Sequence, residues 1–438
     1  MNKLQSQLLA AAVCSAFFLT PCAAVVKDAV PSAADKITRT PVKERKLRYK
    51  NILLRDFRTV KDGQVVNFNI GTAAHGPATL NVLQKYLPDS CNITLWADAP
   101  LAPELAAMMQ RRFPDIKIVH GDLEQEPSAE LLAAVDNSDL FLISSGSGIA
   151  GSVKKSMEQY QKRTGKPVAA YAIGCTEALL PYLENLEFVW LRDPVAAQIA
   201  KKSSCPLQGF APDAVFDFDA VDQVGAEQFM RENNLQPNQF ICCIPGQRYT
   251  PRWQFFNSEP DQKKIAENDR FEEHDNAVLR NIITIAVREY GMKVLICPEQ
   301  VTEMALIRPR IYDRLPQDVQ ANCVPMDKMW APDTALAIYK ASRGVFGVEI
   351  HSQVMAIGNN IPGVLFYPRE FGSKGKMWET VGLAEWLIYT DEPNYAQKAE
   401  AALRDILENP EQTAEKLRLA RKFIDKSNQE AIRKAFLY

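Results

Sequence analysis

The strongest constraint on the fold of this chain is a repeated alternation of short apolar runs with amphipathic stretches. The apolar runs lack alternating polar residues, which is typical of parallel strands covered by helices on both faces. The pattern occurs twice, with a pause after Asp219, and therefore predicts two successive α/β units with parallel sheets. The predicted strands are residues 65–70, 92–97, 116–119, 139–144, 167–173 and 188–191, then 240–244, 293–297, 323–325, 344–347 and 363–366.

Amphipathic helices are expected between these strands. They are predicted at 77–86, 103–112, 128–137, 153–164, 277–290 and 333–342, with two more within 395–435. Two Rossmann-like, doubly wound α/β domains closed by C-terminal helices predict a GT-B-like fold with a ligand cleft between its lobes. The expected division is a first domain over 49–220, a second over 221–390 and terminal helices over 391–438.

The N-terminus differs from the rest of the chain. Lys3, an apolar run over 8–19 and the small residues before and at Ala24 predict a secretory signal peptide over 1–24, cleaved near Ala24. Such a leader predicts a periplasmic or secreted protein. The polar, aperiodic segment 25–48 is expected to be a flexible lead-in. No later segment is long and apolar enough to span a bilayer, so we expect no membrane span in the mature chain.

Composition narrows the possible partners. The chain has 51 Lys and Arg against 53 Asp and Glu, a formal net charge of -2. Nucleic-acid binders usually carry a basic surplus, so we expect no nucleic-acid partner. Of nine cysteines, seven follow the predicted leader, and none has the spacing of a metal site. We therefore predict no bound metal and no resident cofactor.

Three turns that follow strands of the first unit can carry chemistry, because ligands bind beyond the carboxyl ends of such strands. Gly71 allows the backbone to approach a ligand, although it could equally serve the turn alone. The segment 144–148 (SSGSG) exposes backbone N–H groups, with Gly146 and Gly148 expected to line the cleft. Arg192 and Asp193 could bind an anion or form an ion pair that only holds the turn.

Two turns of the second unit add further candidates. Arg248 follows the run FICCI at a predicted cleft edge, where its planar guanidinium could bind a carboxylate or phosphate, unless it is a surface residue. Glu349 and His351 follow another strand and lie two residues apart, so they can project the same way. His351 could act as a general acid, with Glu349 orienting it or acting as a base. Ser352 follows directly.

The order of these segments resembles the polysaccharide pyruvyl transferase family. The likeness covers most of residues 65–390 and is carried by DLFLISSGSG, GKPVAAYAIGC, LRDP, FICCIPGQR, VLICPEQ and HSQVMAIGNNIP. It implies a GT-B-like fold and transfer of a pyruvyl ketal from phosphoenolpyruvate, as co-substrate, to a sugar of a glycan acceptor. By the same resemblance, His351 is the active-site general acid. The implied donor-binding residues are Arg248, Arg192, Lys374 and Ser352.

One residue departs from the family pattern and keeps other functions open. The family has an arginine two residues before the histidine, and Glu349 replaces it here. A carboxylate facing an anionic donor needs compensation from Arg248, Lys374 or a metal. Export would also separate the protein from cytoplasmic phosphoenolpyruvate. Two alternatives are therefore glycosyl transfer or hydrolysis with Glu349, His351 and Asp193, and glycan binding without catalysis.

Aromatic residues could supply sugar-stacking surface for the binding alternative, although core packing is the more common fate of such residues. They are Trp253, Phe255, Phe256, Trp330 and Trp378. Several of them lie in or beside the segment 252–274, which is predicted to be a long loop and a possible lid over the cleft.

Overall fold

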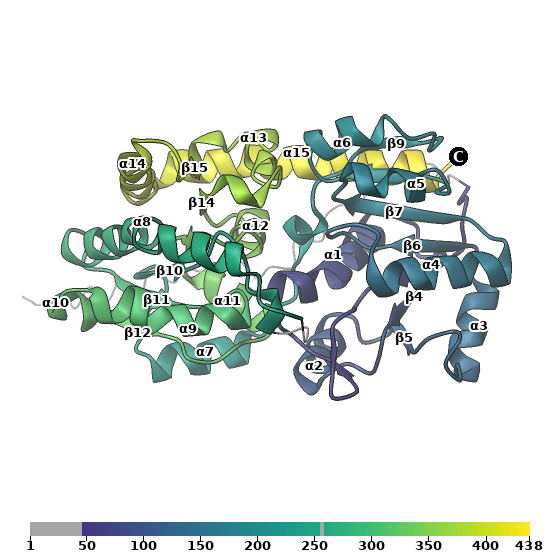
Figure 1. Cartoon of the computed structure of the whole chain (residues 1–438), viewed down its shortest axis with the longest axis horizontal. Coiled ribbons are helices and arrows are strands. Elements are labelled where there is room, and N and C mark those ends of the chain that lie inside the picture. The colour runs from purple at the N-terminus through teal and green to yellow at the C-terminus, as the bar shows by residue number, and fades with distance from the viewer. Residues whose placement is uncertain (1–45, 255–257) are drawn as a thin grey trace, which may run out of the picture. The chain divides into compact units, whose positions relative to one another are not determined.

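The computed structural model of the chain describes residues 46–254 and 258–438 (Figure 1). The predicted signal peptide and nearly all of the predicted lead-in lie outside the described residues. The last residues of that segment are described and pair with the end of the chain. The Arg48 N–H donates to Phe436 O (2.8 Å), and the Tyr438 N–H donates to Lys46 O (3.0 Å). Within the described part, no helix combines the length and apolarity needed to cross a membrane.

Two parallel sheets form the framework. The first has the order β5-β4-β1-β6-β7-β8-β9 and the second β12-β11-β10-β13-β14-β15. In both, the first strand is central and the order reverses beside it, which is the Rossmann topology. The strands of the first sheet are β1 (Asn51–Arg55), β4 (Asn92–Ala97), β5 (Lys117–His120), β6 (Leu140–Ile143), β7 (Val168–Ile173), β8 (Val189–Leu191) and β9 (Gln208–Phe210). Those of the second are β10 (Phe240–Ile244), β11 (Lys293–Ile296), β12 (Cys323–Pro325), β13 (Val345–Gly347), β14 (Gly363–Tyr367) and β15 (Leu387–Tyr389).

Helices alternate with these strands. They are α1 (Ile70–Tyr86), α2 (Pro103–Arg112), α3 (Ala129–Asn137), α4 (Gly151–Thr164), α5 (Leu180–Leu183), α6 (Pro194–Ala200), α7 (Gln223–Glu232), α8 (Gln262–Arg288), α9 (Met304–Leu306), α10 (Gln317–Gln320), α11 (Pro332–Ala341), α12 (His351–Gly358), α13 (Lys376–Thr380), α14 (Tyr395–Glu408) and α15 (Pro410–Phe436). A small antiparallel pair, β2 (Val60–Lys61) and β3 (Gln64–Val65), lies outside both sheets. The predicted fold class, two Rossmann-like α/β units with C-terminal helices in a GT-B-like fold, is confirmed.

Burial on both faces explains why the strands read as unbroken apolar runs. In β1, Ile52 and Leu54 belong to one hydrophobic cluster, and Leu53 belongs to another on the opposite face. All three are at most 1% exposed. Successive side chains of a strand point to opposite faces, so a sheet that helices cover on both sides selects an apolar residue at nearly every position.

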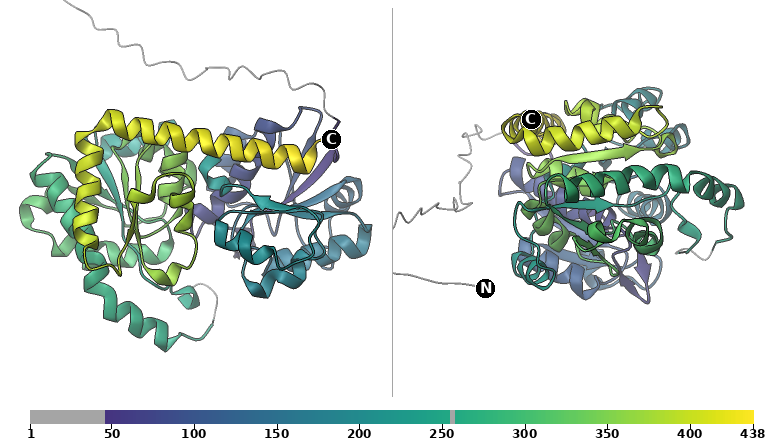
Figure 2. Two further views of the ribbon diagram at one scale, coloured as in Figure 1. Left: turned by 90° about the horizontal axis from the view of Figure 1, so that it is seen from above. Right: turned by 90° about the vertical axis from the view of Figure 1, so that its left-hand side faces the viewer.

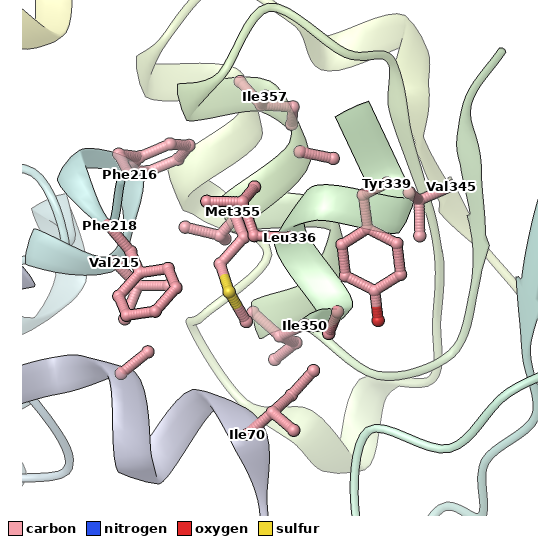
Figure 3. Close-up of a cluster of buried hydrophobic side chains, with 14 of the residues drawn as sticks. Ile70, Val215, Phe216, Phe218, Leu336, Tyr339, Val345, Ile350, Met355 and Ile357 are labelled. Atoms are coloured by element: carbon pink, nitrogen blue, oxygen red, sulfur yellow. The ribbon is translucent and has the colours of Figure 1, made fainter. Parts of the chain in front are cut away.

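A shared core fixes the two helices that carry the site (Figure 3). Ile70 of α1 and Phe216, from the 3-10 turn Ala214–Asp217, pack into the same cluster as Ile350 and Met355 at α12. Neither helix can shift there without opening a cavity, because protein interiors are close-packed. The start of α1 and the start of α12 are thus held against each other.

Two predicted segments are wrong. Residues 65–70 are not a strand, because Asn69 caps α1: its side chain accepts the Thr72 N–H at 2.9 Å, and the helix begins at Ile70. The first strand of the sheet is instead β1. The predicted loop over 252–274 is mostly helix, since Asp261 caps α8 and the helix runs on from Gln262. Its early turns are charged and largely exposed, so an apolar pattern that would reveal the helix is missing.

The last helix, α15, packs against elements of both α/β units (Figure 2). It contacts α12 and α14 from the second unit, and α1 and β9 from the first. Buried Asn428 on this helix donates to Asp217 Oδ2 (2.6 Å) and accepts from the Tyr171 hydroxyl (2.8 Å). A buried polar network of this kind fixes one position of the helix, because any other position leaves polar groups unpaired.

Candidate active site

A cavity of about 660 Å³ is bordered by the carboxyl ends of strands from both sheets. The turn after β1 contributes Asp56 and Arg58, and the turn after β6 contributes Ser145. The turn after β13 contributes Glu349 and leads directly into His351. These strands flank the points where the strand order reverses in each sheet, which is where parallel α/β sheets bind their ligands.

His351 is held by a buried glutamate that follows β11. The His351 Nδ1 lies 3.1 Å from Glu299 Oε1, and Glu299 is fully buried. The second oxygen of Glu299 accepts from the Ser352 N–H (2.7 Å) and hydroxyl (2.9 Å). Burial opposes ionisation of Glu299, but the hydrogen bonds from His351 and Ser352 hold its pKa below the ordinary value. An ionised carboxylate only accepts, so Nδ1 carries a proton.

The other ring nitrogen of His351, Nε2, is buried and has no hydrogen-bond partner in the described part of the chain. Since His351 lines the cavity, this nitrogen is available to a ligand. A histidine oriented through Nδ1 by a carboxylate, with Nε2 free, is the arrangement used for proton transfer in many active sites.

A second histidine lies against the first. His75 of α1 meets His351 edge to face, with ring centroids 5.0 Å apart at 85°. Its Nδ1 lies 3.5 Å from Asp213 Oδ1, and Asp213 Oδ2 accepts from Arg192 at 2.8 Å. Burial lowers the pKa of His75 well below its ordinary value, more than Asp213 raises it. Burial opposes ionisation of Asp213, yet His75 and Arg192 hold its pKa well below the ordinary range.

The same residues are a possible metal-binding group. His75, Asp213 and His351 each offer a ligand atom, and these atoms lie within 4.8 Å of one another. Imidazole and carboxylate donors suit zinc or another transition ion. However, Arg192 already neutralises Asp213, so a divalent cation would compete with a buried guanidinium. This environment fits an anion better than a cation, and the absence of a metal stays a prediction.

Positive charge dominates the walls of the cavity, where six basic side chains stand against three acidic ones. The basic residues are Arg58, Arg192, Arg248, Arg252, Lys264 and Lys374. The buried Nε atoms of Arg58 and Arg192 have no hydrogen-bond partner among the described residues. Burial lowers the pKa of Lys374 to about 8. Within residues 46–254 and 258–438, the Lys374 ammonium group makes no hydrogen bond or ion pair. These groups can therefore receive an anionic ligand.

Glu349 lines the cavity but does not pair with His351. Its carboxylate accepts from the Gln300 side chain at 2.7 Å. The predicted pairing fails because β13 ends at Gly347, so the alternation of a strand no longer applies at His351, the first residue of α12. Burial and the nearby charge of Glu299 raise the pKa of Glu349 to about 7.

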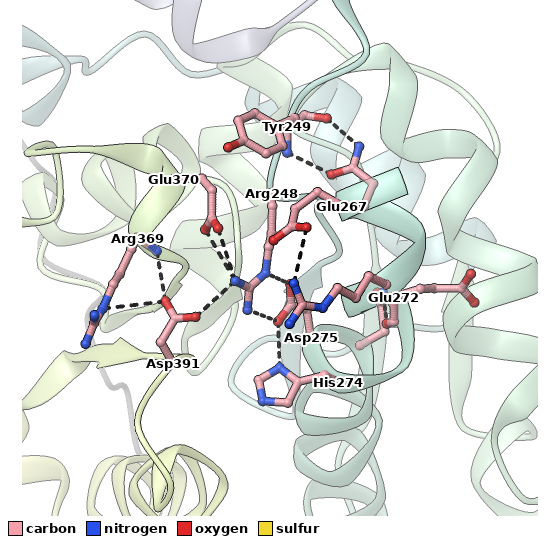
Figure 4. A network of polar contacts seen from close by, with 12 residues as sticks. Arg248, Tyr249, Glu267, Glu272, His274, Asp275, Arg369, Glu370 and Asp391 are labelled. Atoms are coloured by element: carbon pink, nitrogen blue, oxygen red, sulfur yellow. Dashed lines mark hydrogen bonds and ion pairs between the residues drawn. The ribbon is translucent and has the colours of Figure 1, made fainter. Parts of the chain in front are cut away.

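Arg248 is not available to a ligand in the way predicted (Figure 4). Its guanidinium binds Asp275 through Nε (2.8 Å) and Nη2 (3.0 Å). Its Nη1 donates to Asp391 (3.0 Å) and to Glu370 (3.3 Å). The group also stacks on Phe271, 3.4 Å from the ring centroid. Every nitrogen is therefore engaged, and three carboxylates surround a single positive charge. The predicted donor-binding role is corrected to a structural one.

Two further polar residues act on the protein itself. Ser352 is fully buried and binds Glu299, so it supports the glutamate behind His351 and does not reach the cavity. Asp193 accepts the Ala196 N–H at 2.8 Å as the N-cap of α6, which is the turn-holding alternative. Its neighbour Arg192, by contrast, lines the cavity.

The three predicted glycines have different surroundings. Gly146 lines the cavity with a φ of +142° that favours glycine. Gly71 lies against the imidazole of His351, and a Cβ there would overlap the ring. Gly71 therefore makes room for His351 without lining the cavity. Gly148 faces Leu179 and the Gly174 carbonyl instead of the cavity.

The aromatic residues proposed as a sugar platform divide into core and cavity. Trp330 and Trp378 are buried in the hydrophobic core, whereas Trp253 lines the cavity. Phe255 and Phe256 lie outside the described residues. The described residues that line the cavity include four further aromatic residues, Phe57, Phe68, Tyr249 and Phe371.

Sequence reasoning missed four residues that the structure brings to the site. Glu299 lies in the run VLICPEQ, directly after a predicted strand. That position alone could have marked it as a candidate site residue. His75 lies within α1, and Asp213 lies between β9 and the 3-10 turn Ala214–Asp217; nothing in the sequence links them. Arg58 follows a strand that was not predicted, so no signal pointed to it.

Fold and site together define a class. Two Rossmann-like units border a cationic cavity that contains a carboxylate-oriented histidine, and such a cavity suits an anionic ligand. The polysaccharide pyruvyl transferase family model matches residues 69–369, so the chain belongs to this family. This membership supports a transferase that acts on glycans.

Solved structures with a similar fold share little sequence with the chain. A putative UDP-N-acetylglucosamine 2-epimerase from Listeria monocytogenes is 13% identical, with 87% of this chain and 94% of that chain covered, at a TM-score of 0.49. The heptosyltransferase II from E. coli that uses ADP-heptose is 12% identical, with 82% and 99% covered, at a TM-score of 0.47. A search of curated proteins finds no match.

Proposed function

We propose that this protein transfers the pyruvyl group of phosphoenolpyruvate to two hydroxyl groups of a glycan sugar, with formation of a ketal. The observation that carries the proposal is the His351 Nε2 beside Arg58 and Arg192, all with ring or guanidinium nitrogens that lack a hydrogen-bond partner among the described residues. Family membership supplies the reaction class. The geometry supports the assignment of roles to individual residues.

Donor binding is assigned to Arg192, Arg58 and Lys374. Phosphoenolpyruvate carries a phosphate and a carboxylate, and both suit guanidinium and ammonium donors. Arg192 retains an unpartnered Nε after its bond to Asp213, and Arg58 retains an unpartnered Nε after its bond to Ser144 (3.1 Å). A bound anion would also stabilise the protonated form of Lys374, whose pKa burial depresses.

Glu349, which replaces the family's arginine, is compatible with such a donor. Its raised pKa, about 7, leaves part of the population uncharged near neutral pH. Charge repulsion with the donor is then smaller than for an ordinary glutamate. The positive charge lost at this position has a substitute in Arg58 and Lys374, which also line the cavity.

His351 supplies the proton that starts the reaction. With Nδ1–H directed at Glu299, a second proton on Nε2 passes to C3 of phosphoenolpyruvate, which becomes a methyl group and leaves C2 electrophilic. One acceptor oxygen bonds to C2 as its O–H bond breaks, the bond from C2 to the phosphate oxygen breaks, and the phosphate leaves. The second acceptor oxygen then bonds to C2 and loses its proton. The products are the ketal and inorganic phosphate.

The test is turnover with phosphoenolpyruvate and a panel of saccharides in D₂O. We expect phosphate release together with a ketal whose methyl group carries one deuterium from solvent. His351→Gln should abolish both, whereas His120→Gln, at an exposed histidine outside the cavity, should retain both. The proposal fails if the wild type neither binds phosphoenolpyruvate nor forms a ketal.

The same assay separates the alternative chemistries. A glycosyl transferase would consume a sugar nucleotide, and a glycosidase would cleave a glycoside, in both cases without phosphoenolpyruvate. A non-catalytic glycan binder would bind saccharides in calorimetry and turn over none of these donors. Either result would replace the proposed reaction.

A further inference from the structure

The site contains two imidazoles in contact, each beside its own carboxylate. His351 is paired with Glu299, and His75 faces Asp213. The rings are 5.0 Å apart between centroids, so both cannot carry a positive charge without strong repulsion in a buried setting. The two rings therefore differ in how readily each accepts a second proton.

The two carboxylates are not equivalent. Among the described residues, the donors to Glu299 besides His351 are neutral, namely the N–H and hydroxyl of Ser352 and the Asn69 amide (3.5 Å). Glu299 also lies close to its histidine. Asp213 already balances the charge of Arg192 and also accepts from the Val215 N–H. Its distance to His75 Nδ1, 3.5 Å, is too long for a strong hydrogen bond. Glu299 therefore favours a charged imidazole more strongly than Asp213 does.

Every other charged group that faces His75 works in the same direction. Arg192, Arg58 and the His351 ring all disfavour a positive charge on it. Asp56 packs against the adjacent Gly76, but Arg58 lies 3.6 Å from its Oδ1 and compensates its charge, and burial raises the pKa of its carboxyl. The surroundings therefore keep His75 neutral in the resting site, whereas the contact with Glu299 stabilises a proton on His351 Nδ1.

The open edge of the His75 ring faces the cavity. Its Nδ1 points to Asp213, and its Cδ2 lies beside Gly146, where a Cβ would stand 3.7 Å away. Because both residues line the cavity, an acceptor hydroxyl can approach the nitrogen adjacent to Cδ2. Neutral imidazole with Nδ1 protonated presents a lone pair at that nitrogen.

We propose that His75 is a second proton-transfer group, the base that deprotonates the acceptor hydroxyls while His351 acts as the acid. This inference rests on the proposed function. In the first addition, the proton from the acceptor O–H passes to His75 and leaves with the phosphate. In the second, the proton again passes to His75, which releases it to solvent. His351 takes a proton from solvent in place of the one given to C3, and the cycle closes.

The role is tested with the variant His75→Gln and its matched control His120→Gln. We expect kcat to fall by about 100-fold or more, as for other general bases. The KM for phosphoenolpyruvate should stay within about threefold, since His75 is not assigned to the donor. Wild-type kcat should decline at acidic pH, where the base becomes protonated, and this decline should vanish in the variant. Retention of kcat or of the acidic decline overturns the proposal.

The protonation of His75 and the metal content of the site can each be measured in addition to the effect of His75→Gln on activity. The chain has only four histidines, so long-range ¹H–¹⁵N spectra of the wild type can follow each ring as pH is lowered. His75 should take up a proton only at a pH well below the ordinary imidazole value, and protonation of His75 near that value overturns the proposal whether or not turnover is found. Loss of turnover in EDTA, with recovery on adding Zn²⁺, would mean that these nitrogens bind a metal and would also overturn it. If no ketal forms but His75 takes up a proton as expected, only the proposed function is refuted.

Discussion

Arg192 and Arg248 follow buried strands of different sheets and are almost equally buried, at 4% and 3% exposed, yet their surroundings differ. Arg248 is bonded to three carboxylates, and each of its nitrogens has a partner. Arg192 is paired with Asp213 alone, and its Nε has no partner among the described residues. One guanidinium completes an ion network, and the other has capacity left for a ligand.

The comparison teaches that burial at a strand end does not by itself mark a binding arginine. A buried guanidinium loses its solvation and must be compensated by carboxylates. Where these outnumber it, as around Arg248, an added anion meets net negative charge and is repelled. Where one carboxylate balances it and other cations stand near, as around Arg192, an anion completes the site.

The largest expected effect is on stability, at Arg248. Arg248→Met leaves Asp275, Glu370 and Asp391 without their shared cation, and we expect a loss of about 3–5 kcal/mol in the free energy of unfolding. Urea denaturation measures it. Arg252→Met, at an exposed arginine of the same turn region, should change the value by less than about 0.5 kcal/mol. Equal stability of the two variants would break the distinction drawn here.

The next effect is on catalysis, at Arg192. Arg192→Gln should lower kcat/KM for phosphoenolpyruvate by about 100-fold, the scale of one or two lost charge-assisted hydrogen bonds. The control is Arg163→Gln, which removes an exposed arginine paired with Asp136. It should leave kcat/KM at the wild-type value. The comparison would be reversed if Arg192→Gln kept its activity while folded Arg248→Met lost donor binding.

Glu349 offers a pH-dependent test of the charged cavity. Its folded pKa, about 7, exceeds the ordinary 4.5, so between these values the folded state keeps a proton that the unfolded state has lost. Stability contributed by this group is present at low pH and falls as pH rises through the window. Glu349→Gln should nearly match the wild type near pH 4.5 and exceed it by about 3 kcal/mol at pH 8. Denaturation of both proteins at the two pH values measures the difference in their stability. The same difference at both pH values would contradict the raised pKa of Glu349.

The smallest effect is expected at Asp193, beside Arg192. Asp193→Ala removes the cap of α6 and should cost about 1 kcal/mol of stability. Its kcat/KM should stay near the wild-type value, because Asp193 does not line the cavity. Thermal unfolding and the ketal assay measure the two quantities. A large catalytic loss would place Asp193 in the site with its neighbour.

Much of the fold could be predicted because strands buried on both faces leave a local pattern. FICCI and NITLWA read as strands without any knowledge of their neighbours. The edge strands β9 and β15 were not predicted, although the equally short β12 and β13 were. The start of α8 was missed because its exposed turns have no apolar stripe.

The site was only partly predictable because its decisive contacts join distant residues. Arg248 binds carboxylates 27, 122 and 143 positions away in the chain. The sequence therefore does not reveal that all three of its guanidinium nitrogens have partners. The glutamate that orients His351 lies 52 positions before it, whereas Glu349, two positions before it, drew the prediction. A strand end tells which turns reach the cavity, but three-dimensional contacts decide which charges remain free there.

The most direct test of the account is a crystal structure of the protein with phosphoenolpyruvate bound. We predict a donor oxygen within about 3 Å of Arg192 Nε and C3 facing His351 Nε2, with Arg248 still bonded to its three carboxylates. A donor bound at Arg248, or one outside the cavity and remote from His351, would contradict it.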